Sequence, residues 1–165
     1  MAMTTNSGEG GPGPVRRDAA FGLVPVFFGA GVSGDRGEYL LIQHQAGHWA
    51  FPKGHAEADE TPLASAKREF EEETGIFDYR VVAGAQFEEI YEIRKSKGPI
   101  QKTVLYFPAI ALTQTVTVQV AEIRDFVWLP YGAARDRITF DANRGVIDQA
   151  QQFWANLDRD RAEFI

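Results

Sequence analysis

Residues 54–76 read GHAEADETPLASAKREFEEETGI and contain a predicted helix that breaks the usual rules of helix stability. Thr61 can cap the N-terminus, Pro62 stands at the first helical position, and Gly75 is a typical C-terminal stop. Four glutamates gather near the C-terminal end: Glu69, Glu71, Glu72 and Glu73. Anions there oppose the helix dipole, and like charges three or four residues apart cost roughly 0.2–0.5 kcal/mol each. A local violation without a local compensation indicates a functional site.

The helical period separates these glutamates into two groups. The apolar residues Leu63, Ala66 and Phe70 share one face, which should pack on a sheet. The adjoining side carries Glu69, Glu72 and Glu73, whereas Glu71 points away from them. The three carboxylates form either an acidic, solvated helix face or a set of hard oxygen ligands for Mg²⁺ or Mn²⁺. A bound cation would turn their mutual repulsion into coordination.

Length and composition limit the classes of protein. The 165 residues, 44% of them hydrophobic, suffice for one domain with a sizeable core. The chain has no cysteine, which excludes disulfides and fits a cytoplasmic protein. Its net charge of −6 predicts no general attraction to nucleic acid or to anionic membranes. The longest apolar run is too short to cross a bilayer, so we expect no membrane partner.

The N-terminal residues 1–17 are rich in Gly, Ser, Thr and Pro and lack the apolar core of a signal peptide. We predict a flexible tail there, followed by a single domain over residues 18–165. Arg16 and Arg17 end this tail, and they either contact phosphate or lie in solvent.

The remaining chain alternates between strand-like and helical patterns. Strands are predicted at residues 21–29, 38–45 (antiparallel to the first), 79–83, 86–93, 102–112, 116–120 and 126–129. A short helix is predicted at 131–136 and an amphipathic helix at 142–157. No βαβ unit repeats, which favours a mixed sheet with helices on its faces. The basic stretch 94–98 is predicted to be a hairpin loop that is either solvated or in contact with an anionic ligand.

The opening stretch resembles the Nudix signature: Gly, five residues, Glu, seven residues, then Arg-Glu-apolar-x-Glu-Glu-x-Gly-apolar. Its nine specified positions are filled by Gly54, Glu60, Arg68, Glu69, Phe70, Glu72, Glu73, Gly75 and Ile76. The resemblance implies an α/β fold, an α/β/α sandwich with a mixed sheet in a single domain. It also implies hydrolysis of a nucleoside diphosphate linked to another moiety, with Mg²⁺ or Mn²⁺ as cofactor.

The resemblance also assigns roles to residues. The implied metal ligands are Glu69, Glu72, Glu73 and the backbone carbonyl of Lys53. Arg68 would orient a glutamate, and Glu60 would hold the loop against the helix. Glu122 is either one more acidic ligand or catalytic base, or an ordinary loop carboxylate.

Residues outside the signature resemble the asymmetric diadenosine tetraphosphate hydrolase branch of the family. The similar stretches are WAFPKGH at 49–55, KTVLYF at 102–107 and WL at 128–129. In that branch Lys102 would contact phosphates. Residues 53–55 form either an ordinary turn after a core aromatic segment or an approach to phosphate, with Lys53 and His55 as cationic or donor groups. Tyr91 and Phe153 are our candidates for stacking on adenine, and Phe153 is either such a stacking residue or part of the core. Such an enzyme would release ATP and AMP.

Two other functions remain open. The Trp-x-Phe-Pro-Lys-Gly pattern also resembles RNA 5′-pyrophosphohydrolases, although the acidic charge and the lack of a long basic stripe weigh against RNA. A non-catalytic nucleotide sensor would need a degenerate signature or an added DNA-binding domain, and the sequence shows neither. We therefore expect a small nucleotide substrate, no DNA partner, and a monomer or weak dimer.

Overall fold

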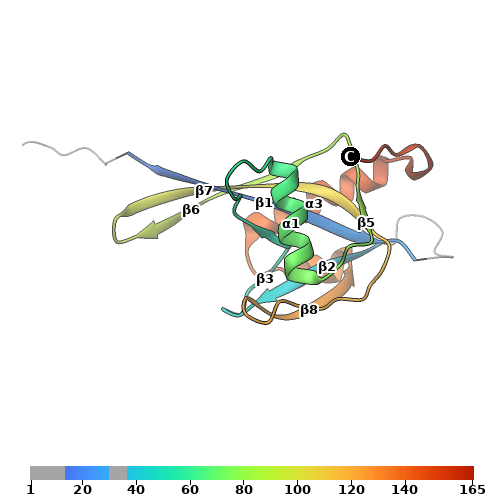
Figure 1. Cartoon of the computed structure of the whole chain (residues 1–165), viewed down its shortest axis with the longest axis horizontal. Helices are drawn as coiled ribbons and strands as arrows, with labels where there is room; N and C mark the ends of the chain where they lie inside the picture. The colour runs from blue at the N-terminus through green and yellow to red at the C-terminus, as the bar shows by residue number, and fades with distance from the viewer. Residues whose placement is uncertain (1–13, 30–36) are drawn as a thin grey trace, which may run out of the picture.

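A computed structural model describes residues 14–29 and 37–165 (Figure 1). The strands are β1 (Arg16–Phe27), β2 (Glu38–His44), β3 (Trp49–Ala50), β4 (Lys53–Gly54), β5 (Tyr79–Val81), β6 (Phe87–Lys95), β7 (Gly98–Ala111) and β8 (Ile123–Pro130). The helices are α1 (Pro62–Thr74), α2 (Tyr131–Arg137), α3 (Asp141–Asn156) and the short 3₁₀ helix η1 (Arg159–Arg161). The eight strands form one mixed sheet, in which β1 and β7 run parallel and the other pairs run antiparallel.

The sheet buries apolar side chains on both of its faces. In β1, Val24 packs into a cluster that includes Trp154 of α3, whereas the adjacent Leu23 packs into a second cluster that includes Phe70 of α1. Successive side chains of a strand point to opposite faces, so α3 and α1 cover opposite faces of the sheet. The predicted mixed α/β/α sandwich is confirmed.

Helix α1 begins and ends at the predicted residues. The Thr61 hydroxyl accepts a hydrogen bond from the Ala64 amide at 3.1 Å, and Pro62 occupies the first turn. Gly75 takes a left-handed conformation with φ of 66°, and its amide donates to the carbonyl of Glu71. Both ends are therefore fixed by local sequence, and the glutamates between them are held by packing on the sheet.

The β6–β7 hairpin projects from the body of the molecule, and the first residues of β1 run along it (Figure 1). Arg16 lies opposite Ile100 of β7, and Lys95 of β6 lies opposite Gly98. We call this projection, residues 16–18 and 91–102, the arm. Its three strands follow the order β1–β7–β6.

Three predicted segments differ from the structure. Arg16 and Arg17 belong to β1 rather than to a tail, while residues 1–13 of the predicted tail lie outside the described residues. Strands β6 and β7 extend through most of the predicted loop 94–98. Residues 116–120 form no strand, because the amides of Thr117 and Gln119 bond to the carbonyls of Thr74 and Glu73 at the end of α1. Within the described residues, no helix has the length and apolarity needed to cross a membrane.

Candidate active site

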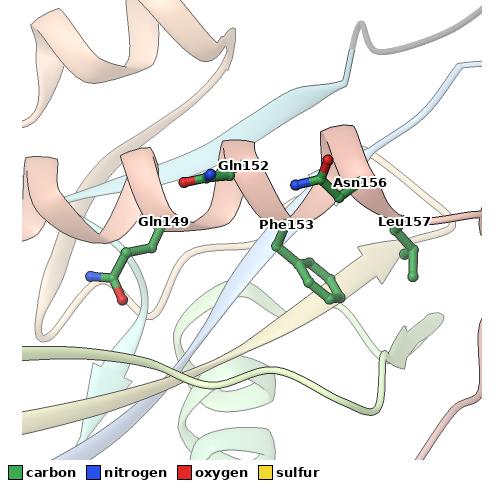
Figure 2. A pocket seen from close by; sticks show the side chains of 5 residues that line it. All are labelled: Gln149, Gln152, Phe153, Asn156 and Leu157. Atoms are coloured by element: carbon green, nitrogen blue, oxygen red, sulfur yellow. The ribbon is translucent and has the colours of Figure 1, made fainter.

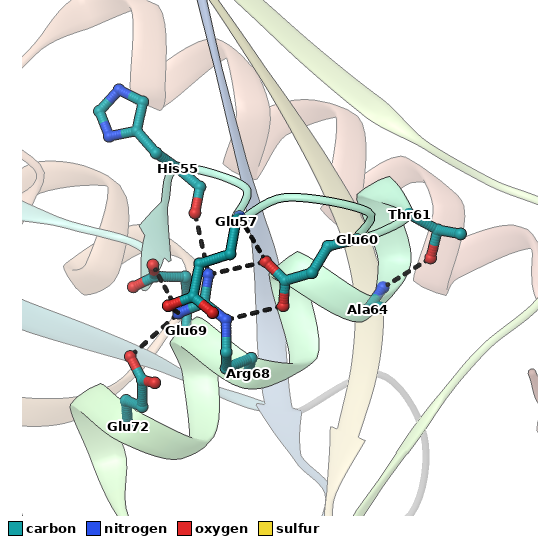
Figure 3. A network of polar contacts seen from close by, with 8 residues as sticks. All are labelled: His55, Glu57, Glu60, Thr61, Ala64, Arg68, Glu69 and Glu72. Atoms are coloured by element: carbon teal, nitrogen blue, oxygen red, sulfur yellow. Dashed lines mark hydrogen bonds and ion pairs between the residues drawn. The ribbon is translucent and has the colours of Figure 1, made fainter.

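Arg68 is the centre of a polar network on α1 (Figure 3). Its guanidinium binds Glu60 in a bidentate manner, with Nε to Oε2 at 2.7 Å and Nη2 to Oε1 at 2.9 Å. Its Nη1 donates to Glu69 and to Glu72, each at 3.1 Å, and its Nη2 donates to the carbonyl of His55 at 2.9 Å. One cation thus ties the preceding loop to the acidic side of the helix.

Gly54 allows the carboxylate of Glu69 to approach the β4 backbone. A Cβ atom at position 54 would stand 2.1 Å from Cδ of Glu69, which is far inside van der Waals contact. Burial raises the pKa of Glu69, whereas the hydrogen bond from Arg68 acts in the opposite direction. The glycine of the signature is therefore required by the packing of the glutamate against the strand.

Glu73 is the most deeply buried carboxylate of the helix, with only 1% of its surface exposed. The backbone amide of Lys53 donates to it, but its Oε2 has no hydrogen-bond partner among the described residues. Burial, followed by the charge of Glu69, raises the pKa of Glu73 to about 8. The charge of Glu122 also raises the pKa of Glu73 and of Glu69, so Glu122 acts electrostatically on both carboxylates, and its role in the site stays a prediction.

The donor set suits a hard divalent cation. Carboxylates of Glu69, Glu72 and Glu73 supply oxygen ligands, and the unpartnered Oε2 of Glu73 is a buried acceptor in need of a positive charge. Across residues 14–29 and 37–165, no three acidic or histidine side chains already stand close enough to hold an ion. In this structure Nη1 of Arg68 occupies two of the three carboxylates, Glu69 and Glu72.

A cavity of about 710 Å³ opens on the face of the sheet that α3 covers, and Lys53 connects it to the acidic helix, because Lys53 lines the cavity while its backbone amide donates to Glu73. Its lining includes Lys53 and Lys102, the aromatic residues Tyr91 and Phe140, and the buried Asn143. Burial lowers the pKa of Lys53, while the charge of the nearby Glu89 raises it. The cavity thus combines three basic residues, since Arg94 also lines it, with two aromatic rings, and Glu89 and Glu92 belong to its lining as well.

Asp18 connects two of the predicted phosphate-binding residues. Its Oδ2 accepts from Nζ of Lys102 at 3.2 Å and lies 3.0 Å from Nε2 of His55. The hydrogen bond with His55, followed by that with Lys102, lowers the pKa of Asp18 against the effect of its burial. His55 therefore faces Asp18 and does not line the cavity itself.

Phe153 does not line the large cavity. It lines a separate, shallow hollow of about 390 Å³ on α3 (Figure 2), and its ring packs edge-on against Phe87 and Trp154. Phe140, just before α3, takes its place as the second aromatic residue of the large cavity. The amphipathic pattern of α3 could not separate a core ring from a ligand-facing ring.

The sequence did not reveal several cavity residues. Phe140 is 57% exposed and occupies the N-cap position of α3, where polar residues are preferred. An aromatic residue at a position where a polar cap is expected was the one feature of the sequence that could have pointed to Phe140. His44 and His48 also line the cavity. Their rings stack with centroids 4.3 Å apart, and the ring centroids of His48 and Phe140 lie 5.6 Å apart. Asn143 gave no signal.

Comparisons with known proteins agree with this geometry. The model of the NUDIX domain matches residues 23–150. Asymmetrical bis(5′-nucleosyl)-tetraphosphatases are 31% identical to the chain: the protein of Rattus norvegicus over 119 residues (70% of this chain, 80% of the relative) and that of Sus scrofa over 123 residues (73% and 82%). The crystal structure of a C. elegans Ap4A hydrolase binary complex superimposes with a TM-score of 0.73 at 25% identity, covering 84% of this chain and 98% of that one.

Proposed function

The chain belongs to the Nudix hydrolase family, and from that premise we propose that it hydrolyses dinucleoside polyphosphates, above all diadenosine tetraphosphate, to ATP and AMP. One observation carries the proposal: Lys53, whose backbone amide donates to Glu73 of α1, also lines a cavity that holds a second lysine and two aromatic rings. Its volume of about 710 Å³ lies within the usual range for a small-molecule site. The relatives with that named activity support the same substrate class.

The basic and the aromatic side chains of the cavity would bind different parts of the substrate. Lys53 and Lys102 would bind the polyphosphate chain, and Asp18 holds Lys102 in place until phosphate arrives. Tyr91 and Phe140 would contact the faces of an adenine ring. Stacking of a base on an aromatic side chain contributes about 1–3 kcal/mol. The bound base would therefore position the polyphosphate with respect to the acidic helix.

Nudix hydrolases generally use divalent metal ions, and we propose Mg²⁺ or Mn²⁺ here. Glu69, Glu72, Glu73 and the carbonyl of Lys53 would hold the ion, which would polarise a phosphoryl oxygen and lower the pKa of water. Glu69 and Glu72 would then exchange Arg68 for the ion, while Glu60 keeps Arg68 in the site through its bidentate bonds.

Proton transfer from the attacking water requires a carboxylate that is not itself neutralised by Arg68. We assign this role to Glu122, because it is exposed and its charge acts on both Glu69 and Glu73. Water adds to a phosphorus of the chain, the bridging P–O bond breaks, and the proton passes to the carboxylate. Attack at the fourth phosphate yields ATP and AMP.

A substrate panel with Mg²⁺ or Mn²⁺ tests the proposal. We expect turnover of diadenosine tetraphosphate to exceed that of 5′-triphosphorylated RNA, with ATP and AMP, rather than two ADP, as the products on chromatography. A chelator should remove the activity. Negligible turnover of diadenosine tetraphosphate would refute the proposed substrate.

A pair of variants on α1 tests the roles within the acidic helix. Glu72→Gln should lose most metal-dependent hydrolysis while the fold is retained, because Glu72 is half-exposed and serves the site rather than the core. Glu71→Gln is the matched control, since Glu71 accepts a hydrogen bond from the Tyr79 hydroxyl at 2.8 Å, away from Arg68. Near-normal activity in Glu72→Gln would contradict its assignment as a ligand.

A further inference from the structure

The arm carries a charge opposite to that of the rest of the molecule. Its residues include two anions, Asp18 and Glu92, and six cations: Arg16, Arg17, Arg94, Lys95, Lys97 and Lys102. The arm therefore has a net charge of +4, and the remainder of the chain carries −10 of the total of −6. Strand pairing brings the basic residues of the arm together from segments about 80 residues apart in the sequence, because β1 pairs with β7 and β7 with β6.

The pairing register sorts the side chains of the arm onto two faces. On β7, Lys102 precedes Val104 and Tyr106 by two and four residues, and these two belong to the cluster that α3 covers. Lys102, Ile100 and the registered Arg16 thus share the face on which the large cavity opens. On β6, Tyr91 and Ile93 share it too, because they lie opposite Lys102 and Ile100, and by alternation so does Lys95.

This face of the arm combines cations with accessible apolar side chains. Tyr91, Ile93 and Ile100 are only partly buried, and Arg16 and Lys95 are exposed. Within the described part of the chain, neither Arg16 nor Lys95 has an ion pair, whereas Lys102 is paired with Asp18 at 3.2 Å. Two cations are therefore available to an anionic ligand.

We propose that this face of the arm binds single-stranded nucleic acid. Single strands are bound by a positively charged track that follows the phosphates and by apolar or aromatic side chains that contact the bases, and the arm offers both. The surface begins at Tyr91 and Lys102, which also line the cavity, and it continues outward to Lys95 and Arg16. The inference goes beyond hydrolysis of dinucleoside polyphosphates and does not depend on it.

The length of the arm favours a strand over a mononucleotide. Four residues separate Tyr91 from Lys95, which at about 3.3 Å per residue places them roughly 13 Å apart. A nucleoside placed between Tyr91 and Phe140 would occupy the cavity, so a ligand that also reaches Lys95 must extend well beyond one nucleoside. A phosphodiester chain does so while it presents regularly spaced charges.

Fluorescence anisotropy with labelled oligoadenylates of about ten nucleotides, one RNA and one DNA, tests the proposal in the presence of a chelator. Both strands carry a 5′-hydroxyl, so no hydrolysable polyphosphate can bring them to the catalytic carboxylates. The test variant is Arg16→Ala/Lys95→Ala, which removes the two available cations of the binding face. The control is Arg17→Ala/Arg124→Ala, which removes the same charge from the opposite face of the arm and from β8.

The wild-type protein should bind the oligonucleotides saturably, with an affinity that falls as salt rises. Each lost phosphate contact lowers the salt slope by about 0.7 for a single strand, which corresponds to about fivefold in affinity near 0.1 M salt. The test variant should therefore bind about 10- to 25-fold more weakly, and the control should change less than about twofold. Preference between RNA and DNA identifies the natural strand.

Three outcomes would overturn the proposal. The first is a lack of saturable binding by the wild-type protein at about 0.1 mM. The second is equal weakening of binding in the test and control variants, which would leave only non-specific charge attraction. In the third, inorganic tripolyphosphate binding falls in Arg16→Ala/Lys95→Ala while oligonucleotide binding does not, which would assign the arm to the polyphosphate of a small substrate. None of these measurements depends on turnover of diadenosine tetraphosphate, so failure of the proposed activity and failure of this site are distinguishable.

Discussion

The free energy of unfolding of the metal-free protein should fall as the pH rises, and replacing Glu73 with glutamine should abolish this fall. Burial and the charge of Glu69 raise the pKa of Glu73 from an ordinary value of 4.5 to about 8. A carboxyl whose pKa is higher in the folded chain stabilises the fold below its unfolded pKa. That contribution is lost as the pH rises through the folded pKa. The window is therefore pH 4.5 to about 8.

The size of the effect follows from the two pKa values. Between about pH 5 and pH 7, a carboxyl with pKa values of 4.5 unfolded and about 8 folded loses about 2–3 kcal/mol of stabilisation. The glutamine amide does not titrate. It replaces a group whose Oε2 already lacks a partner among the described residues, so the pH-independent cost is small. The free energy of unfolding of Glu73→Gln, relative to that of wild type, should therefore be about 2–3 kcal/mol higher at pH 7 than at pH 5.

Thermal and chemical unfolding in a chelator measures this difference directly. For a chain of this length, about 2–3 kcal/mol corresponds to a relative shift in Tm of roughly 5–10 °C. Glu71→Gln is the control, because it removes a carboxylate from the same helix turn but from the side that faces Tyr79. If wild type and Glu73→Gln lose stability in parallel between pH 5 and pH 7, Glu73 is not held in its neutral form and the electrostatic account is wrong.

Four further substitutions test the packing of the site and its surroundings. Gly54→Ala should lower kcat at least about tenfold, because the new Cβ would stand 2.1 Å from Cδ of Glu69 and displace that carboxylate; steady-state kinetics would show it, and an unchanged kcat would contradict the close approach. Phe140→Ala should raise KM for diadenosine tetraphosphate about 5- to 100-fold with little change in Tm, since one stacking contact contributes about 1–3 kcal/mol, whereas Phe153→Ala should lower Tm and leave KM nearly unchanged. Asn143→Leu should destabilise the fold by about 2–4 kcal/mol in denaturant titrations, because it removes the partner of three buried groups, and a loss below about 1 kcal/mol would show that those groups find other partners.

The sequence was sufficient wherever a function depends on one element and its own period. The signature, the caps of α1 and the separation of Glu71 from the other glutamates all lie within residues 54–76, and helix geometry alone relates them. It was insufficient where a site is built by pairing between distant segments. Phe140 reaches the cavity only because α3 packs on the sheet, and Arg16 reaches the arm only because β1 runs parallel to β7. The net charge of −6 likewise did not reveal the basic arm, because a sum over the whole chain does not show where the charges lie.

The placement of the basic residues of the site depends on the core more than on their own contacts. Lys102 points to the cavity because Val104 and Tyr106, two and four residues later on β7, are completely buried under α3. A slip of one residue in this strand would turn Lys102 to the opposite face and expose those two side chains to the wrong layer. The register is fixed by apolar burial, so the polar residues on the arm add little to stability. Substitutions such as Arg16→Ala can therefore change what the arm binds while the acidic helix, anchored by Phe70 on the other face, keeps its position.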